Sequence, residues 1–465
     1  MNGTNNGLNK KVVLLVTTLS SFLTPFMGSS VNIGLPSIGN EFAMNAILLS
    51  WVSTAYLLAA AIFLVPLGRI ADIHGRKKMF LYGISLDLAA SLLLVISNNE
   101  IELIVLRVFQ GIGGAMIFGT GVAILTSAYP VGERGKVLGI NVAGVYTGLS
   151  LGPVISGFLT QYFGWRSIFL SYVPLELIII VLTVWKLRGE WAEAKGEKFD
   201  FAGSAIYGLA LVAIMYGFSL LPAMSGALLV LIGVLGILIF VVWETKAKCP
   251  VLNIHLFRHN PTFAFSNMAA LINYSATSAT AFLMSLYLQY IKGFNPQDAG
   301  FIMVSQPIVM AIFSPFAGRL SDKIEPRIVA STGMALTAAG LFLFTILNEN
   351  TSLWFIIACL ILVGFGFALF SSPNTNAIMS SVEKKFYGVA SGMVGTMRLI
   401  GQMLSMGIAM LVLAVYLGRV QITPEYYPLF MTSMKTIFIL FALLCFAGVF
   451  ASLARGRVRT SGAER

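Results

Sequence analysis

Long apolar stretches separated by short polar loops recur along the whole chain. A helix needs roughly 20 apolar residues to cross a hydrocarbon core about 30 Å thick, and fourteen stretches approach or exceed that length. They begin near residues 12, 46, 79, 101, 137, 167, 201, 225, 262, 297, 328, 352, 387 and 432. The first continues to about Pro36, which is too long for a cleaved signal peptide. The pattern predicts an all-α integral membrane protein with fourteen spans.

Charge is scarce and unevenly placed. Only 11% of the residues are charged, against about 25% in soluble domains. Of the 30 Lys and Arg residues, 24 fall on the side of the predicted spans that holds both termini, four fall on the other side and two lie within spans. The positive-inside rule therefore predicts a multi-pass cell-membrane protein with cytoplasmic N- and C-termini. The net charge of +11 then reflects topology and attraction to the lipid bilayer, so we expect no nucleic-acid partner.

An internal repeat divides the chain. AIFLVPLGRIAD at 61–72 and AIFSPFAGRLSD at 311–322 share six of twelve residues at an offset of 250. Six spans with their loops occupy about 190 residues, so the offset leaves room for two inserted spans. We therefore expect an N-terminal six-helix bundle at 1–187, linkers with an inserted two-helix hairpin at 188–260, and a C-terminal six-helix bundle at 261–465.

The turn GRIADIHGRKK, residues 68–78, concentrates charge between the second and third spans. Gly68 and Gly75 allow a tight reversal of the backbone, and the basic residues hold the turn in the cytoplasm. Topology requires no acid, whereas a carboxylate such as Asp72 is stabilised near the N-terminus of a helix. Asp72 is therefore either part of a solvated turn or a contact to the span that begins near Tyr387 in the opposite half.

Three charged residues lie deep within predicted spans of the first half: Asp87, Arg107 and Glu176. An unpaired guanidinium at such depth costs at least about 2.5 to 3.5 kcal/mol, so Arg107 needs a partner or water. Helical depth separates it from Asp87 by about 7 Å, which indicates a charge pair that either responds to protonation or bridges helices statically. Glu176 has no nearby base on its own helix and is a second candidate proton carrier. Arg398 raises the same question in the second half, where a packing contact explains it nearly as well.

Five motifs occur on these spans: SVNIGLP at 30–36, GRIADIHGRKK with its echo GRLSDKIEPR, RVFQGIGGA at 107–115, GLSLGPVISG at 148–157 and GWRSIF at 164–169. Over nearly its whole length the chain resembles the major facilitator superfamily and, within it, the fourteen-span drug-proton antiporter subfamily. The resemblance implies the major facilitator fold, with two six-helix bundles and two extra transmembrane helices between them.

The resemblance also assigns four groups of residues. A conformational latch that closes while the cavity faces outward comprises Gly68, Asp72, Gly75, Arg76, Gly318 and Asp322. The resemblance implies that Arg107 takes part in proton coupling, and the buried acids Asp87 and Glu176 are candidates for the same role from their depth in the spans. The antiporter motif of the fifth span comprises Gly148, Gly152, Pro153 and Gly157. The substrate cavity is lined by Ser29, Asn32, Gln110, Tyr146, Asn273, Tyr274, Gln306, Asn374 and Arg398.

One position departs from the resemblance. The subfamily carries an acid in the first span where this chain has Met27, which leaves Asp87 and Glu176 as the intramembrane carboxylates. We expect a monomer that performs secondary active efflux of amphipathic organic compounds, with the proton gradient as its energy source and no cofactor. A metabolite exporter or a uniporter without proton coupling is the alternative. A membrane enzyme or sensor fits less well, because all three histidines fall in loops and no residues have metal-ligand spacing.

Overall fold

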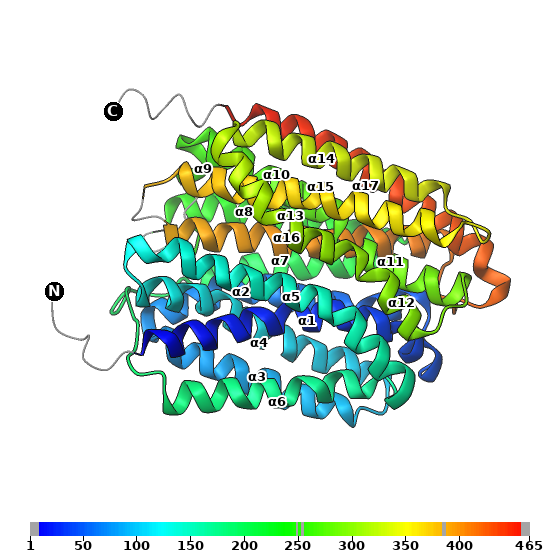
Figure 1. The fold of residues 1–465 in the computed structure, drawn as a ribbon, viewed down its shortest axis with the longest axis horizontal. Coiled ribbons are helices and arrows are strands. Elements are labelled where there is room, and N and C mark those ends of the chain that lie inside the picture. The colour runs from blue at the N-terminus through cyan, green and yellow to red at the C-terminus, as the bar shows by residue number, and fades with distance from the viewer. Residues whose placement is uncertain (1–8, 248–249, 253–254, 384–386, 457–465) are drawn as a thin grey trace.

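The computed structural model describes residues 9–247, 250–252, 255–383 and 387–456, and every regular element in these ranges is a helix (Figure 1). The first half contains α1 (Lys10–Glu41), α2 (Ala46–His74), α3 (Arg76–Val95), α4 (Glu100–Ala128), α5 (Val131–Phe163) and α6 (Arg166–Trp185). Two further helices follow, α7 (Phe201–Leu220) and α8 (Met224–Lys246). The second half contains α9 (His255–His259), α10 (Pro261–Thr277), α11 (Thr280–Leu286), η1 (Tyr287–Ile291), α12 (Pro296–Met303), α13 (Ser305–Lys323), α14 (Pro326–Leu343), η2 (Phe344–Ile346), α15 (Leu353–Ser380), α16 (Tyr387–Tyr416), η4 (Pro424–Tyr426) and α17 (Tyr427–Ala454).

Several helices begin at an asparagine. The Asn45 side chain accepts from the backbone N–H groups of the first turn of α2, and Asn99 and Asn260 cap α4 and α10 in the same way. Such caps satisfy amide groups that have no partner within the helix. Between α2 and α3 the chain reverses at Gly75, whose φ of 123° is a conformation that favours glycine.

Among the described residues, thirteen helices are long and apolar enough to cross a membrane, whereas the sequence predicted fourteen spans. The difference lies at residues 261–291, where the chain forms three shorter pieces, α10, α11 and the π-helix η1. The first piece, α10, has 17 residues and ends at Thr277. Beyond it, the backbone N–H of Ala279 donates to the Ser405 hydroxyl of α16 at 2.9 Å. A side chain from a neighbouring helix thus satisfies the backbone where this helix breaks.

The helices pack into two bundles, with α7 and α8 against the seam between them. In the first bundle, α1 packs on α5 and α6 while α4 packs on α2 and α3; in the second, α15 packs on α13 and α14 while α10 packs on α16 and α17. The inserted helix α7 contacts α2 of the first bundle and α16 of the second. Tyr207 of α7 donates to the Ala61 carbonyl of α2 at 3.0 Å. The inserted pair therefore covers the seam between α2 and α16.

The helices of both bundles run between two opposite ends of the molecule. The start of α1 and the end of α17 lie at one end of the molecule, here called the terminal end (Figure 1). The connections between α1 and α2, between α5 and α6, and between η1 and α12 lie at the opposite end, here called the far end (Figure 1). These names imply no orientation in a membrane.

The two halves meet closely at the far end. The backbone N–H of Ala46 in α2 donates to the Val420 carbonyl, just beyond α16, at 3.1 Å, and Ile47 packs against α16. Toward the terminal end the helices that face the other half have more space. A Cβ built on Gly139 of α5 or Gly392 of α16 would meet no heavy atom of the described residues within 4 Å.

Glycines let α5 pack tightly against α1. A Cβ added at Gly148 would lie 2.2 Å from the Phe22 carbonyl oxygen, and one added at Gly152 would lie 2.0 Å from the Ser29 hydroxyl oxygen. Any other residue would force the helices apart, because real side chains do not approach a backbone carbonyl so closely.

The same motif also packs α5 against α12 of the second half. A Cβ added at Gly157 would lie 2.6 Å from the Pro296 carbonyl oxygen. In the reverse direction, a Cβ added at Gly300 of α12 would lie 2.2 Å from the Pro153 carbonyl oxygen. The glycine-rich stretch at 148–157 therefore packs α5 within its own bundle and joins the two halves at the far end.

We expect Gly148→Ala to destabilise the folded protein by about 1–3 kcal/mol, because the added methyl group overlaps a backbone carbonyl. Gly139→Ala is the matched control, since the same substitution in the same helix meets open space and gains helix propensity. Thermal unfolding in detergent, followed by size-exclusion chromatography, measures both variants. Equal melting temperatures would contradict the packing described here.

Candidate functional site

Three charged side chains are buried together inside the first bundle. Arg107 of α4 and Asp87 of α3 are each 1% exposed, and Glu176 of α6 is 0% exposed. The sequence selected the same three residues for proton coupling. They meet because α3 packs on both α4 and α6. Charged groups this far from water require polar partners at short range.

A chain of hydrogen bonds connects Arg107 to Glu176. Arg107 Nη1 donates to Gln110 Oε1 at 2.6 Å. Gln110 Nε2 then donates to Ser91 Oγ at 2.9 Å, and the Ser91 hydroxyl donates to Glu176 Oε1 at 3.3 Å. A change of charge at Glu176 can therefore affect Arg107 without direct contact between them.

Arg107 is also held against α2. Its Nε donates to the Val52 carbonyl at 3.0 Å, and its guanidinium carbon lies 4.7 Å from the centroid of the Tyr56 ring, within the range of a cation–π interaction. The expected direct pair with Asp87 is not formed: in the described part of the chain, no carboxylate oxygen lies within 4.0 Å of the Arg107 nitrogens. The relay through Gln110 takes its place.

The carboxyl groups of Asp87 and Glu176 lie close enough to interact with each other. Ionised carboxylates only accept hydrogen bonds, so a hydrogen bond between these two acids needs a proton on one of them. Asp87 Oδ1 and Glu176 Oε2 are buried and receive no hydrogen bond from an N–H or O–H group of the described residues. A proton held between the two acids would supply the missing donor and leave one carboxylate charge opposite Arg107.

Three of the expected cavity residues lie in the packed interiors of the bundles. Gln110 and Asn273 are each 0% exposed and Asn374 is 2% exposed. Gln110 belongs to the Arg107 relay. Asn374 Oδ1 accepts from Arg455 Nη1 at 2.9 Å, and its Nδ2 donates to the Ser266 carbonyl at 3.1 Å. The structure thus gives Gln110 and Asn374 partners inside their own halves.

Two other candidates meet in the second bundle. The guanidinium carbon of Arg398 in α16 lies 5.6 Å from the Tyr274 ring centroid in α10, and the Tyr274 ring packs edge-on against Phe367 at 5.5 Å. Arg398 thus contacts a neighbouring helix of its own half, and its place in the substrate cavity stays a prediction.

The remaining cavity candidates are only half-buried: Ser29, Asn32, Tyr146 and Gln306. Ser29 Oγ donates to the Pro25 carbonyl of its own helix at 2.9 Å. Asn32 Oδ1 accepts from the Ser53 hydroxyl of α2 at 3.2 Å. Tyr146 lies on α5 of the first half and Gln306 on α13 of the second half, and these two helices contact each other. No group of three or more His, Cys, Asp or Glu side chains that could hold a metal ion occurs in the described ranges.

The charged turn at the terminal end is bound by the linker, residues 186–200 between α6 and α7. Arg76 Nε donates to Asp72 Oδ1 at 2.7 Å, while its two terminal nitrogens donate to the two carboxylate oxygens of Glu193 at 2.8 and 3.0 Å. The backbone is bound too, since the Arg76 N–H donates to the Trp191 carbonyl at 2.8 Å and the Ala194 N–H donates to the Asp72 carbonyl at 2.9 Å. The linker therefore holds both Asp72 and Arg76.

A second glutamate of the linker reaches the turn itself. Glu190 Oε1 accepts from the Lys77 N–H at 2.8 Å. A Cβ built on Gly75 would lie only 2.5 Å from the Glu190 carboxylate carbon, so this glycine gives the linker room as well as reversing the chain. At the other end of the linker, Glu197 pairs with Arg69.

Electrostatics favours the charged form of Glu193. Burial alone would raise the pKa of this carboxyl. The hydrogen bond and positive charge of Arg76, together with the hydrogen bond from Ser127, lower the pKa by more than burial raises it, so the pKa of Glu193 is below its usual range. Glu193 is thus an anion at neutral pH and remains paired with Arg76.

The latch residues are found in the following places. Asp72 bonds within its own half as described, and the side chain of Tyr387 lies outside the described residues. In the second half, Asp322 Oδ1 accepts from Asn376 Nδ2 at 3.3 Å. Gly68 has open space around its Cα, whereas a Cβ on Gly318 would lie 2.9 Å from the Ser372 hydroxyl. The contact between Asp72 and α16 was expected in an outward-facing conformer, so it stays a prediction.

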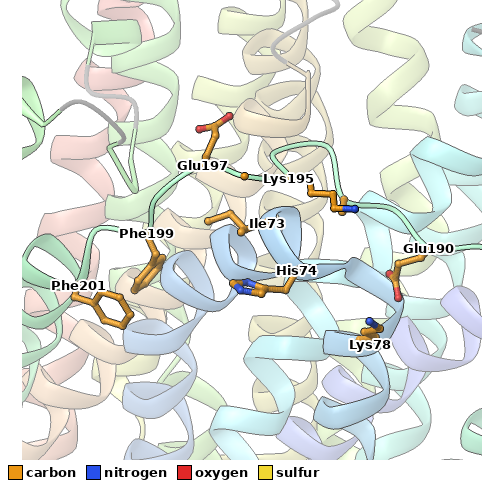
Figure 2. Close-up of a pocket in the computed structure, with 10 residues that line it drawn as sticks. Ile73, His74, Lys78, Glu190, Lys195, Glu197, Phe199 and Phe201 are labelled. Carbon is orange, nitrogen blue, oxygen red and sulfur yellow. The ribbon is translucent and has the colours of Figure 1, made fainter.

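A hollow of about 690 Å³ is lined by residues of the charged turn and of the linker. Figure 2 shows His74 at the end of α2 and Lys78 in the first turn of α3, with Glu190 and Lys195 of the linker beside them. Phe199, near the start of α7, closes the other side. Water can reach the turn here, so the linker binds it without sealing it.

Sequence reasoning missed three residues of these sites. Ser91 follows Asp87 by four positions and therefore shares its helix face, a signal that was present. Tyr56 and Glu193 come from other segments, an apolar span and a solvated linker, and nothing in the pattern connects them to Arg107 or Arg76.

Comparison with known proteins identifies the family. The sequence profile of the Major Facilitator Superfamily matches residues 17–248 and 267–464. The chain is 29% identical over 392 residues to the riboflavin transporter RibZ of Clostridioides difficile, covering 84% of this chain and 85% of that protein. It is 30% identical over 423 residues to the multidrug transporter protein MdtP of Bacillus subtilis, covering 88% of this chain and 76% of that protein.

Solved structures share the fold at low sequence identity. A bacterial homolog of the human lysosomal transporter Spinster, inward-facing and unoccupied, superimposes with a TM-score of 0.67 at 16% identity, covering 97% of this chain and 98% of that one. A peptide transporter bound to alafosfalin gives a TM-score of 0.69 at 15% identity, covering 93% of each chain.

The profile covers most of the chain, and two relatives that match it over most of their length are named as transporters. The part of the chain that the structure describes holds thirteen helices apolar enough to span a bilayer, so the chain is a multi-pass membrane transporter and not an enzyme. It belongs to the Major Facilitator Superfamily.

Proposed function

We propose that this transporter exports amphipathic organic compounds in exchange for protons by alternating access, as a monomeric fourteen-span drug-proton antiporter. The observation that carries the proposal is the buried cluster of Arg107, Asp87 and Glu176, which can hold a proton inside the membrane. The similarity to MdtP and to the multidrug resistance protein Stp of Mycobacterium tuberculosis supports the substrate class.

The broken helix of α10, α11 and η1 is the fourteenth span in this proposal. Residues 261–291 would extend about 45 Å at 1.5 Å per helical residue, which exceeds the hydrocarbon thickness of about 30 Å. The terminal end is cytoplasmic in the proposed orientation, because 24 of the 30 Lys and Arg residues belong to that side.

Proton binding is coupled to movement of the halves through α2. With one shared proton, the cluster holds one cation and one carboxylate charge. Loss of the proton leaves two carboxylates, which attract the Arg107 guanidinium away from Val52 and Tyr56 of α2. Since α2 packs on both α4 and α16, its release from Arg107 alters the contact between the bundles. Proton uptake and substrate export then alternate.

Two observations favour the alternative of a metabolite exporter. The relative RibZ is named a riboflavin transporter, and Met27 replaces the acid that the antiporter subfamily carries in its first span. Export of a vitamin-like compound, or transport without proton coupling, would account for both facts. Substrate flux under an imposed pH gradient separates this alternative from antiport.

The test is transport in proteoliposomes with an imposed pH gradient. A panel of lipophilic cations, neutral amphipaths and riboflavin should reveal one class whose flux rises at least tenfold with the gradient and vanishes when an ionophore collapses it. If the flux of the transported compound is the same with and without the pH gradient, antiport is ruled out in favour of the alternative.

We expect Glu176→Gln to abolish gradient-driven transport while leaving substrate exchange across the membrane intact. The glutamine amide can donate to Asp87 as a protonated glutamate would, so the cluster remains neutral and the fold is retained, but no proton can leave. Comparison of net flux with counterflow exchange measures the difference. Glu176→Asp, which keeps a titratable group, is the control and should retain part of the net flux; if Glu176→Gln transports like wild type, the coupling role is wrong.

The charged turn acts as a latch in the proposed cycle. When the terminal end closes, Asp72 meets the start of α16, where a carboxylate is stabilised by the helix N-terminus. Before closure the linker holds Arg76 and Asp72 together through Glu193. The linker thus competes with α16 for the turn.

We expect Glu193→Gln to mobilise the linker at neutral pH. In the native protein the depressed pKa of Glu193 means that its pairing is complete above the ordinary glutamate pKa of about 4.3 and is lost only as the pH falls through a lower value. Fluorescence anisotropy of a probe attached at Lys195→Cys, in a background free of native cysteines, reports the mobility. Glu197→Gln is the control for loss of charge elsewhere in the linker. A fall in the anisotropy of the native linker above pH 5 would contradict this pairing.

A further inference from the structure

The motif SVNIGLP ends in a proline whose position has a consequence for the other half. Pro36 lies inside α1 and has no backbone N–H. The carbonyl of Asn32, four residues earlier, therefore has no donor from its own helix. A carbonyl in this position must find a donor elsewhere or face water.

The donor comes from the second bundle. The Ser285 hydroxyl of α11 donates to the Asn32 carbonyl at 2.5 Å. One helical turn later, Gln289 Nε2 donates both to the Ile33 carbonyl at 3.0 Å and to Ser285 Oγ at 3.0 Å. Two adjacent carbonyls of α1 thus receive hydrogen bonds from one face of the α11–η1 segment, at the far end where the halves meet.

The local geometry suits an interaction that forms and breaks. Gln289 lies in the π-helix η1, a widened turn that is frequent at functional sites. Ser285 is 0% exposed, so a hydroxyl without an acceptor here would be costly. If the halves separate at the far end, water can replace both groups as partners. The bond therefore stabilises the closed arrangement specifically.

Asn32 connects this contact to the rest of the first bundle. Its side-chain Oδ1 accepts from Ser53 of α2 at 3.2 Å, and α2 carries the Val52 carbonyl that binds Arg107. Asn32, whose carbonyl accepts the hydrogen bond from Ser285, is therefore bonded to Ser53, the residue that follows Val52 in α2.

We propose that Pro36 and Ser285 form a hydrogen-bonded gate that closes the far end: Pro36 leaves the Asn32 carbonyl without a helical donor, and Ser285, supported by Gln289, occupies it only when the halves meet. This inference rests on the alternating access of the proposed function. It assigns a positioning role to residues outside the proton site.

The gate predicts that two different substitutions have one effect. Pro36→Ala restores a backbone N–H that competes for the Asn32 carbonyl, and Ser285→Ala removes the donor. Each should raise the ratio of far-end-open to far-end-closed molecules by roughly two- to tenfold, the effect of one neutral hydrogen bond. Because both changes delete the same bond, the ratio in the double variant should equal the ratio in a single variant, and the two separate effects should not multiply.

The measurement is the distribution of distances between spin labels at Asn40→Cys and Asn350→Cys, on the two halves at the far end, in full-length protein whose three native cysteines are serine. Ser285→Thr keeps the hydroxyl and should match wild type. Pro25→Ala is the control for loss of a proline in the same helix, and Ser305→Ala, which removes a hydroxyl that bonds within its own half, is the control for Ser285→Ala.

Multiplied effects in the double variant, or an unchanged ratio in Ser285→Ala, would overturn the gate. The same proteins assayed for transport separate the two proposals. If the variants leave the spin-label distances unchanged while the wild type shows gradient-driven transport, the gate is wrong and antiport stands. If the variants shift the distances while transport by the wild type does not depend on the gradient, the gate is supported and antiport is wrong.

Discussion

Burial of Arg107 among apolar helices places a requirement on everything around it. A guanidinium cannot lose its proton in a protein, so its donors must all find acceptors and its charge must be balanced nearby. The first bundle meets this requirement with the Val52 carbonyl, the Gln110 amide and the Tyr56 ring. Two carboxyl groups lie at the end of the relay, and in the proposed cycle a proton shared between them keeps their charge at one rather than two.

This arrangement relates charge to movement because its partners belong to helices that meet the other half. Val52 and Tyr56 lie on α2, which packs on α16, and Asn32 lies on α1, which bonds to α11. The inserted pair α7 and α8 covers the seam between α2 and α16, whereas α5 faces α12 through glycines. A change in the protonation of one buried pair can therefore bias how the bundles contact each other at the far end.

The sequence was informative where burial alone decides the outcome. Intramembrane charge selected Arg107, Asp87 and Glu176, and the structure brings these residues into one cluster. It was uninformative where a distant segment decides. Asn374 was expected in a cavity because it is a polar residue on a relevant span, yet Arg455, far along the chain, bonds to it inside the second bundle. The break after Thr277 also has no local signal, since no Gly or Pro marks it and the partner of the broken backbone is Ser405, far along the chain.

The shared proton is the central claim, and infrared difference spectroscopy tests it most directly. A protonated carboxyl group has a C=O stretching band distinct from that of a carboxylate. At neutral pH in the substrate-free protein, such a band should be present, shift on hydrogen–deuterium exchange, and disappear in Glu176→Gln combined with Asp87→Asn. A wild-type spectrum without the band, or a band that persists unchanged in the double variant, would contradict the account.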